Sequence, residues 1–273
     1  MAAAKANVYE MVTSRIIAEL EKGNIPWEKP WTGVRSGAYN RISKKAYSII
    51  NQMLLQHTGE YATFKQWTDL GGHIRKGEKS EFVVFWKILE KEVKKIPMLR
   101  YYNVFHISQV DGVKPLALPF AEVEPIEAAD KIITEYIERE HITFEECASN
   151  EAFYSPSRDR VVVPMKQQYK HINEYYSTTF HELTHSTGHK NRLDRLYTGA
   201  DAAFGSETYS KEELVAEIGS ASLMNLLGIE TIKTFRNSAA YIQSWLKVLK
   251  SDNKFIVSAS SKAEKAVNYI IGE

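Results

Sequence analysis

The segment His181-Glu182-Leu183-Thr184-His185 constrains the fold of this chain more than any other feature of its sequence. Two histidines four residues apart reach one metal ion when the segment is an α-helix, because residues i and i+4 project from the same face. Zinc accepts neutral imidazole ligands, and a neighbouring carboxylate can take a proton from a water held by the metal. The spacing therefore predicts a helix over 173–188 with His181 and His185 as zinc ligands and Glu182 as general base.

A third ligand must come from another element, and the next predicted helix, over 210–227, carries Glu213 and Glu217. A glutamate on a following helix is a recurring solution for catalytic zinc. We predict Glu213 as the third ligand and Glu217 as a group that orients the His181 ring without touching the metal. The reverse assignment is the alternative. Ser210 and Glu213 also have the spacing of a helix capping box, which would explain Glu213 without a metal.

His189 extends the pattern to three histidines, but Gly188 is expected to end the helix before it. We therefore place His189 at the rim of the site and not among the ligands. A structural zinc site usually takes four protein ligands, often cysteines, and has no need of a general base. The presence of Glu182 thus favours a catalytic site over a structural one.

The proline-punctuated stretch around residues 114–125 predicts a boundary near residue 120, with domains over 1–120 and 121–273. Regular structure in the first domain is predicted as helices over 5–22, 49–56 and from Thr63 onward, and antiparallel strands over 81–89 and 99–107. In the second domain we predict a helix over 125–140, strands over 142–147, 151–155 and 160–163, and helices over 173–188, 210–227, 231–250 and 261–271. Strands followed by helices predict an α+β fold.

Charge is distributed unevenly along the chain. Residues 1–120 contain 18 lysines and arginines against 11 acidic residues, a net of +7, whereas residues 121–273 have a net of −6. Four of the five tryptophans also fall in the basic half. Cations and flat rings together suit single-stranded nucleic acid, although a solvated basic face over an aromatic core is the alternative. On the strand over 81–89, Phe82, Val84 and Trp86 alternate and are predicted to face the core.

The sequence also indicates where such a protein would work. Cys147 is the single cysteine, so no intramolecular disulfide can form, which favours a reducing compartment. The first ten residues include Glu10 and do not resemble a signal peptide, and no window is apolar enough for a membrane span. We expect a cytoplasmic protein without a membrane partner.

Several motifs taken together resemble those of one known family. In the first half they are Ile25-Pro26-Trp27-Glu28-Lys29-Pro30-Trp31, Tyr47-Ser48-Ile49-Ile50-Asn51, Thr63-Phe64-Lys65-Gln66, the run from Gly71 to Lys79, and Phe82-Val83-Val84-Phe85-Trp86. In the second half they are the run from His181 to His189, Arg192-Leu193 and Glu213-Leu214-Val215-Ala216-Glu217. The whole chain resembles the ArdC-type antirestriction proteins of plasmids and phages, whose N-terminal half also occurs in TraC-type plasmid primases.

The resemblance implies a single-stranded-DNA-binding domain over 1–120 and a zincin-like metallopeptidase domain over 121–273, which together guard incoming DNA against restriction. It also implies Glu213 as the zinc ligand. The partners expected are single-stranded DNA and a host restriction or other protein as peptidase substrate. The alternative is a protein that only coats single strands, with a structural or inactive zinc site. The candidate DNA-contacting residues are Trp27, Lys29, Trp31, Lys44, Lys45, Arg75, Lys76 and Lys79.

Overall fold

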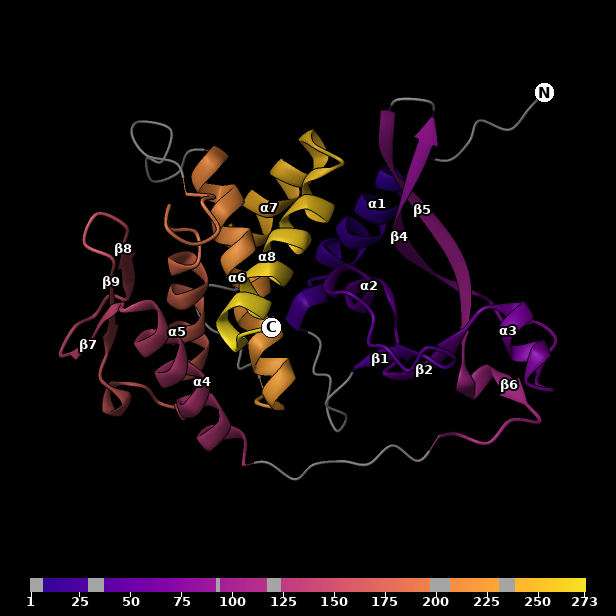
Figure 1. The fold of residues 1–273 in the computed structure, drawn as a ribbon, viewed down its shortest axis with the longest axis horizontal. Helices are drawn as coiled ribbons and strands as arrows, with labels where there is room; N and C mark the ends of the chain where they lie inside the picture. Colours follow the sequence, from indigo (N-terminus) through magenta and orange to yellow (C-terminus); the bar gives the residue numbers. More distant parts are fainter. Residues whose placement is uncertain (1–6, 29–36, 92–93, 117–123, 197–206, 231–238) are drawn as a thin grey trace. The chain divides into compact units, whose positions relative to one another are not determined.

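A computed structural model describes residues 7–28, 37–91, 94–116, 124–196, 207–230 and 239–273 (Figure 1). The chain forms two compact units. The first comprises Met1–Pro26 and Ser36–Phe120, and the second comprises Trp27–Arg35 and Ala121–Glu273. Both combine helices with small sheets, so the α+β prediction is confirmed.

The first unit is built around one mixed sheet. Its strands follow the order β1-β2-β5-β4, with β1 parallel to β2 and the other neighbours antiparallel, and β3 pairs with β6. The described helices are α1 (Val8–Glu21), α2 (Ile49–Leu54) and α3 (Phe64–Asp69), and the strands are β1 (Ala38–Asn40), β2 (Gly59–Ala62), β3 (His73–Ile74), β4 (Glu81–Lys91), β5 (Lys94–His106) and β6 (Val110–Asp111). Every helix and strand predicted for this unit is present.

Local signals set the ends of these helices. The Asn7 side chain accepts a hydrogen bond from the Tyr9 amide at 3.1 Å and caps α1. Thr63 and Gln66 form the predicted capping box at the start of α3, and Gly71 follows its end with φ of +81°. Along α1, Val12, Ile16 and Leu20 are buried, since fourfold spacing aligns them on one helix face.

The strands β4 and β5 run antiparallel as predicted and extend further than predicted (Figure 1). Val84 is buried in this ribbon, but Trp86 is 53% exposed, so its predicted place in the core is wrong. Among the described strands β4 pairs with β5 alone, and the Trp86 ring makes a T-shaped contact with the ring of Tyr9, at 6.3 Å between centroids. Val83, on the opposite face of β4, is 1% exposed and belongs to a core cluster, so both faces are covered at this point and alternation alone did not identify the core face.

The second unit places a small sheet beside a group of helices. In the sheet, β9 lies between β7, which is parallel to it, and β8, which is antiparallel. The described elements are α4 (Pro125–Glu140), β7 (Thr143–Cys147), β8 (Phe153–Ser155), β9 (Arg160–Pro164), α5 (Ile172–Ser186), α6 (Glu207–Leu227), α7 (Ala239–Ser251) and α8 (Phe255–Ile271). Each corresponds to a predicted element, and the first part of the helix predicted over 231–250 lies outside the described residues.

Helix α5 lies at the centre of this unit, where it packs against α6, α8, β8 and β9. Its approach to α6 is close, because a Cβ atom on Gly219 would lie 2.6 Å and 2.8 Å from the side chain of Thr184. Glycine thus lets the two helices approach each other where the histidines of one face the carboxylates of the other. None of the described helices has the length and apolar character needed to cross a lipid bilayer.

Candidate metal centre

Helix α5 presents the two predicted histidines side by side. His181 is 3% exposed, and its Nε2 atom lies 3.1 Å from Nε2 of His185. The ring centroids are 4.7 Å apart with an interplanar angle of 77°. Two imidazole nitrogens that face each other at this distance need a cation between them or a proton on one of them, since two lone pairs repel.

The carboxylate of Glu213 completes the set from helix α6. One oxygen lies 3.5 Å from Nε2 of His181, and the other lies 3.3 Å from Nε2 of His185. Two tetrahedral ligands bound at about 2.05 Å lie about 3.3 Å apart, so these separations fit the ligands of one zinc-sized ion. Because α6 already includes residue 207, Ser210 lies within the helix, and the capping-box explanation of Glu213 is wrong.

Two further carboxylates face the outer nitrogens of the histidines. Glu217 Oε1 lies 3.4 Å from Nδ1 of His181, and Glu212 Oε1 lies 3.4 Å from Nδ1 of His185. Carboxylates in this position orient an imidazole and raise its basicity towards a metal. Glu217 was expected in such a role, whereas Glu212 was not identified from the sequence.

Arg195 holds Glu212 in place. Its guanidinium contacts both oxygens of Glu212 at 2.9–3.2 Å and also donates to the hydroxyl of Thr187. The loop reaches this position by folding back onto the end of α5, where the amides of Arg195 and Leu196 donate to the carbonyl of Gly188 at 3.1 Å and 3.0 Å. This return of the chain depends on tertiary contacts, so the sequence offered no signal for Arg195.

The electrostatics of the site favour a cation. Burial acts to lower the pKa of His185, but hydrogen bonds to Glu212 and Glu213 outweigh it and raise that pKa to about 10. Burial acts to raise the pKa of Glu213, yet hydrogen bonds from His181 and His185 hold it well below its ordinary value. The same negative potential that retains a proton on imidazole would stabilise a divalent metal ion at this position.

A cleft of about 410 Å³ opens onto these groups. It is lined by the three candidate ligands, by Glu182, and by residues of strand β8 and the start of α6. Glu182 is 4% exposed, so its carboxylate lies in a largely dehydrated environment beside the ligands. His189 lies beyond the end of α5, where its ring accepts a hydrogen bond from the Asn191 amide, and it is absent from the ligand cluster of the described residues.

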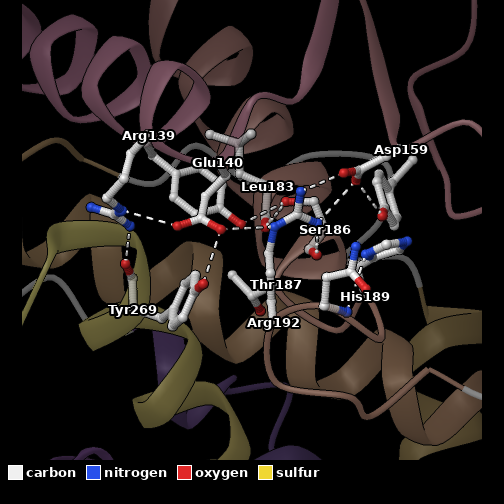
Figure 2. A network of polar contacts seen from close by, with 12 residues as sticks. Arg139, Glu140, Asp159, Leu183, Ser186, Thr187, His189, Arg192 and Tyr269 are labelled. Carbon is white, nitrogen blue, oxygen red and sulfur yellow. Dashed lines mark hydrogen bonds and ion pairs between the residues drawn. The ribbon is translucent and has the colours of Figure 1, made fainter.

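A second network of polar contacts surrounds Arg192 (Figure 2). The guanidinium of Arg192 is 2% exposed and lies between Asp159, at 2.6 Å, and Glu140, at 3.3 Å. It also donates to the carbonyl of Ser186 at the end of α5. Asp159 in turn accepts from the hydroxyl of Tyr154, which lines the cleft. Arg192 thus joins α4, the end of α5 and the β8–β9 turn.

The candidate DNA-contacting residues of the first unit differ in their surroundings. Lys44, Lys45, Lys76 and Lys79 are exposed and have no ion pair with any described residue. Arg75 is also exposed, but its guanidinium pairs with Glu78 at 2.8 Å and with Asp111 at 3.5 Å. Four of these cations are therefore available to a phosphate, whereas Arg75 is already partly neutralised.

Trp27 lies in the second unit and is 2% exposed. Its ring makes a T-shaped contact with the ring of Trp245, at 5.1 Å between centroids, and its carbonyl accepts a hydrogen bond from the Asn225 side chain at 3.4 Å. No ring face is open to a base, so the burial argues against the predicted DNA contact at Trp27. The candidates Lys29 and Trp31 lie outside the described residues.

Comparison with known proteins agrees with this geometry. Residues 128–262 match a zincin-like metallopeptidase family, and residues 6–105 match the N-terminal domain of the anti-restriction factor ArdC. The Mn(II)-bound crystal structure of the antirestriction ArdC protein from the R388 plasmid superposes with a TM-score of 0.79, at 34% identity over 97% of both chains. Its metal-free structure gives a TM-score of 0.77 at 33% identity, over 97% of this chain and 96% of that one.

Curated relatives extend the comparison. Two Escherichia coli proteins named DNA primase TraC are 33% and 34% identical over 99% and 98% of this chain, which spans only 28% and 20% of their lengths. Uncharacterized protein y4eC of Sinorhizobium fredii (strain NBRC 101917 / NGR234) is 33% identical over 97% of this chain and 91% of its own length. With matches that cover both units, the chain belongs to the ArdC family of antirestriction proteins and carries a zincin-like domain.

Proposed function

We propose that this protein protects incoming mobile-element DNA by binding single strands through its first unit and cutting a protein through a zinc-dependent peptidase site in its second. The observation that carries the peptidase half is the position of Glu182. This buried carboxylate lines the same cleft as His181, His185 and Glu213, whose ligand atoms are spaced for one ion. A purely structural site would not need it.

In this proposal the three ligands hold one zinc ion, which supplies Lewis-acid activation of water and of a peptide carbonyl. The carboxylate of Glu182 accepts the proton of the attacking water and delivers it to the leaving amine nitrogen. Glu212 keeps the His185 imidazole oriented by accepting a hydrogen bond from its Nδ1–H group, and Glu217 places a second carboxylate oxygen 3.4 Å from Nδ1 of His181. The Mn(II)-bound relative makes the identity of the metal part of the test.

The test compares wild type with Glu182→Gln, which keeps the size and hydrogen-bonding capacity of the side chain but cannot accept a proton. We expect zinc binding at one ion per chain in both proteins, and a rate of peptide hydrolysis about 10²–10⁴-fold lower in the variant. Mass spectrometry identifies new termini when candidate restriction subunits are incubated with the protein, zinc or manganese, and single-stranded DNA. In cells, Glu182→Gln should lose restriction protection.

The opposite outcome supports a different function. If Glu182→Gln protects DNA as well as wild type, and no candidate protein is cut, the protein acts by coating single strands and its metal site is structural. Glu213→Gln, which removes a ligand oxygen, separates the two cases further. A structural metal would then be needed for the fold, so the variant should lose thermal stability along with its metal.

The DNA half of the proposal is supported by the basic character of residues 1–120 and by the exposed lysines described above. Affinity for single strands should fall with salt, with a slope of about −0.7 per phosphate neutralised. The double variant Lys76→Glu/Lys79→Glu should bind more weakly than wild type. Lys262→Glu/Lys265→Glu in the second unit makes the same change in net charge and should bind as wild type does. Equal losses in both variants would contradict binding through the first unit.

A further inference from the structure

The β4–β5 ribbon exposes aromatic rings that the core does not use. Phe85 is 46% exposed and Tyr102 is 44% exposed, and their ring centroids lie 6.0 Å apart at an interplanar angle of 64°. Burying such rings is favourable, so exposed neighbouring rings commonly mark a site of interaction. The ribbon therefore offers two adjacent aromatic surfaces to a partner.

The register of the ribbon shows which side chains accompany these rings. Tyr102 pairs with Val83, and Arg100 pairs with Phe85, so all four side chains lie on one face. Lys87 lies two residues further along the same face. We call the exposed part, formed by Phe85, Lys87, Arg100 and Tyr102, the Phe85 face.

The core of the first unit supports this face. The ring of Tyr47, which is buried, lies 6.2 Å from the ring of Phe85 and belongs to the same core cluster as Val83. Lys44 and Lys45 precede Tyr47 in the chain and are both exposed. The ring of Phe85 is thus held by the buried Tyr47 ring on one side, while 46% of the residue remains exposed.

Charge on the Phe85 face identifies the kind of partner. Among residues 81–88 and 97–105 the single acidic residue is Glu81, and its carboxylate already accepts from Tyr61 and the Gln56 amide. Lys87 and Arg100 form no ion pair with any described residue. Unpaired cations beside exposed aromatic rings suit single-stranded nucleic acid. The rings can stack on any base, and the cations can bind the phosphates of the backbone.

We propose that the Phe85 face is the base-stacking surface for single-stranded DNA, with bases on Phe85 and Tyr102 and phosphates beside Lys87 and Arg100. This inference rests on the proposed binding of single strands by the first unit. It assigns base stacking to the sheet of that unit, whereas Trp27 has no ring face available for it.

The chain offers a closely matched pair of variants to test the inference. Tyr101 and Tyr102 are neighbours with 42% and 44% exposure, but they lie on opposite faces of the ribbon. We expect Tyr102→Ala and Phe85→Ala each to weaken single-strand binding by about 5- to 150-fold, and Tyr101→Ala to leave it unchanged. Fluorescence anisotropy with a labelled thymidine oligonucleotide measures the affinity, and thermal melting shows that each variant folds. Tyr102→Leu, which keeps apolar bulk but has no flat ring, should lose affinity as well.

Removing the charges tests the other half of the assignment. Lys87→Ala/Arg100→Ala should reduce the salt dependence of binding by about 0.7 in slope for each phosphate that the variant no longer neutralises. If wild type binds single strands, and Phe85→Ala and Tyr102→Ala bind as Tyr101→Ala does, the Phe85 face is not the stacking surface, while the proposed function stands. If wild type binds no single-stranded DNA, the DNA half of the proposed function fails together with this inference.

Discussion

Among the single residues, Glu212 and Arg195 support the candidate metal centre without belonging to its predicted ligands. Glu212 faces the outer nitrogen of His185, and Arg195 fixes Glu212 through both carboxylate oxygens. A histidine ring held from behind in this way keeps its Nε2 atom directed at the ion position. We therefore expect metal affinity to depend on groups that do not touch the metal.

Glu212→Gln tests this dependence. The amide keeps the shape of the side chain but loses the negative charge, so we expect metal affinity to fall by about 10- to 100-fold while the metal still binds. Competition with a chromophoric chelator measures the change. Glu138→Gln, at an exposed position of α4, removes the same charge and should bind metal as wild type does. An unchanged affinity in Glu212→Gln would show that His185 needs no support.

Arg192 gives a prediction about pH. Burial acts to raise the pKa of Asp159, but hydrogen bonds from Arg192 and Tyr154 outweigh it and lower that pKa below its ordinary value. The unfolded chain protonates this carboxyl at about pH 3.9, so around and below that pH the unfolded state binds more protons than the folded state. The stability contributed by Asp159 is present above this pH and is lost as pH falls through the folded-state pKa.

Arg192→Met should therefore have two effects. It leaves Glu140 and Asp159 without their buried cation, which should lower the free energy of unfolding by about 3 kcal/mol at neutral pH. It should also flatten the loss of stability between about pH 5 and pH 3, because Asp159 no longer titrates at a depressed pKa. Chemical denaturation at a series of pH values measures both effects. A variant with the same pH profile as wild type would assign the acid sensitivity to other carboxyl groups.

At the scale of elements, the spacing between α5 and α6 sets the geometry of the ligands. Gly219 meets the side chain of Thr184, so any larger residue must push the helices apart. We expect Gly219→Ala to destabilise the second unit by about 1–3 kcal/mol and to weaken metal binding, since Glu213 lies on the helix that would move. Calorimetry and metal titration measure the two losses.

Thr184→Ala supplies the matched control for this contact. It removes the atoms that lie 2.6 Å and 2.8 Å from the added methyl group, so the double variant should recover part of both losses. Two purely additive losses would mean that Gly219 matters for some reason other than its contact with Thr184.

The elements also show how far the sequence could predict the structure. The start of helix α3 was predictable because its capping box involves only neighbouring residues. The position of His181 and His185 on one helix face was predictable because it follows from their spacing within one helix. Glu212 was not, because its role depends on contact with His185, 27 residues away in the sequence. The exposure of Trp86 depends on where the core ends along β4, which alternation within a strand does not show.

At the scale of the whole molecule, the two units are interleaved in sequence. The chain leaves the first unit after Pro26, contributes Trp27–Arg35 to the second, and returns at Ser36. A single cut near residue 120 would therefore separate Trp27 from its partner Trp245. The predicted domains over 1–120 and 121–273 assign Trp27 to the first domain, whereas its contacts lie in the second unit.

Trp27→Ala distinguishes these two assignments. Because Trp27 is buried against Trp245, the variant should lower the stability of the second unit by about 3–5 kcal/mol, and its affinity for single-stranded DNA should stay that of wild type. Scanning calorimetry and anisotropy measure the two quantities. Lost DNA affinity without lost stability would return Trp27 to the DNA-binding surface.

The interleaving of the units has a consequence for how the protein is made. Trp27 leaves the ribosome long before Trp245, and at 5–20 residues per second the 218 residues that follow Trp27, up to Trp245, take about 10–45 s to synthesise. During that time the residues of the first unit have all been synthesised, whereas Trp27 still lacks Trp245, against which it packs in the folded protein. Each nascent chain thus exposes the apolar indole of Trp27 until Trp245 has been synthesised.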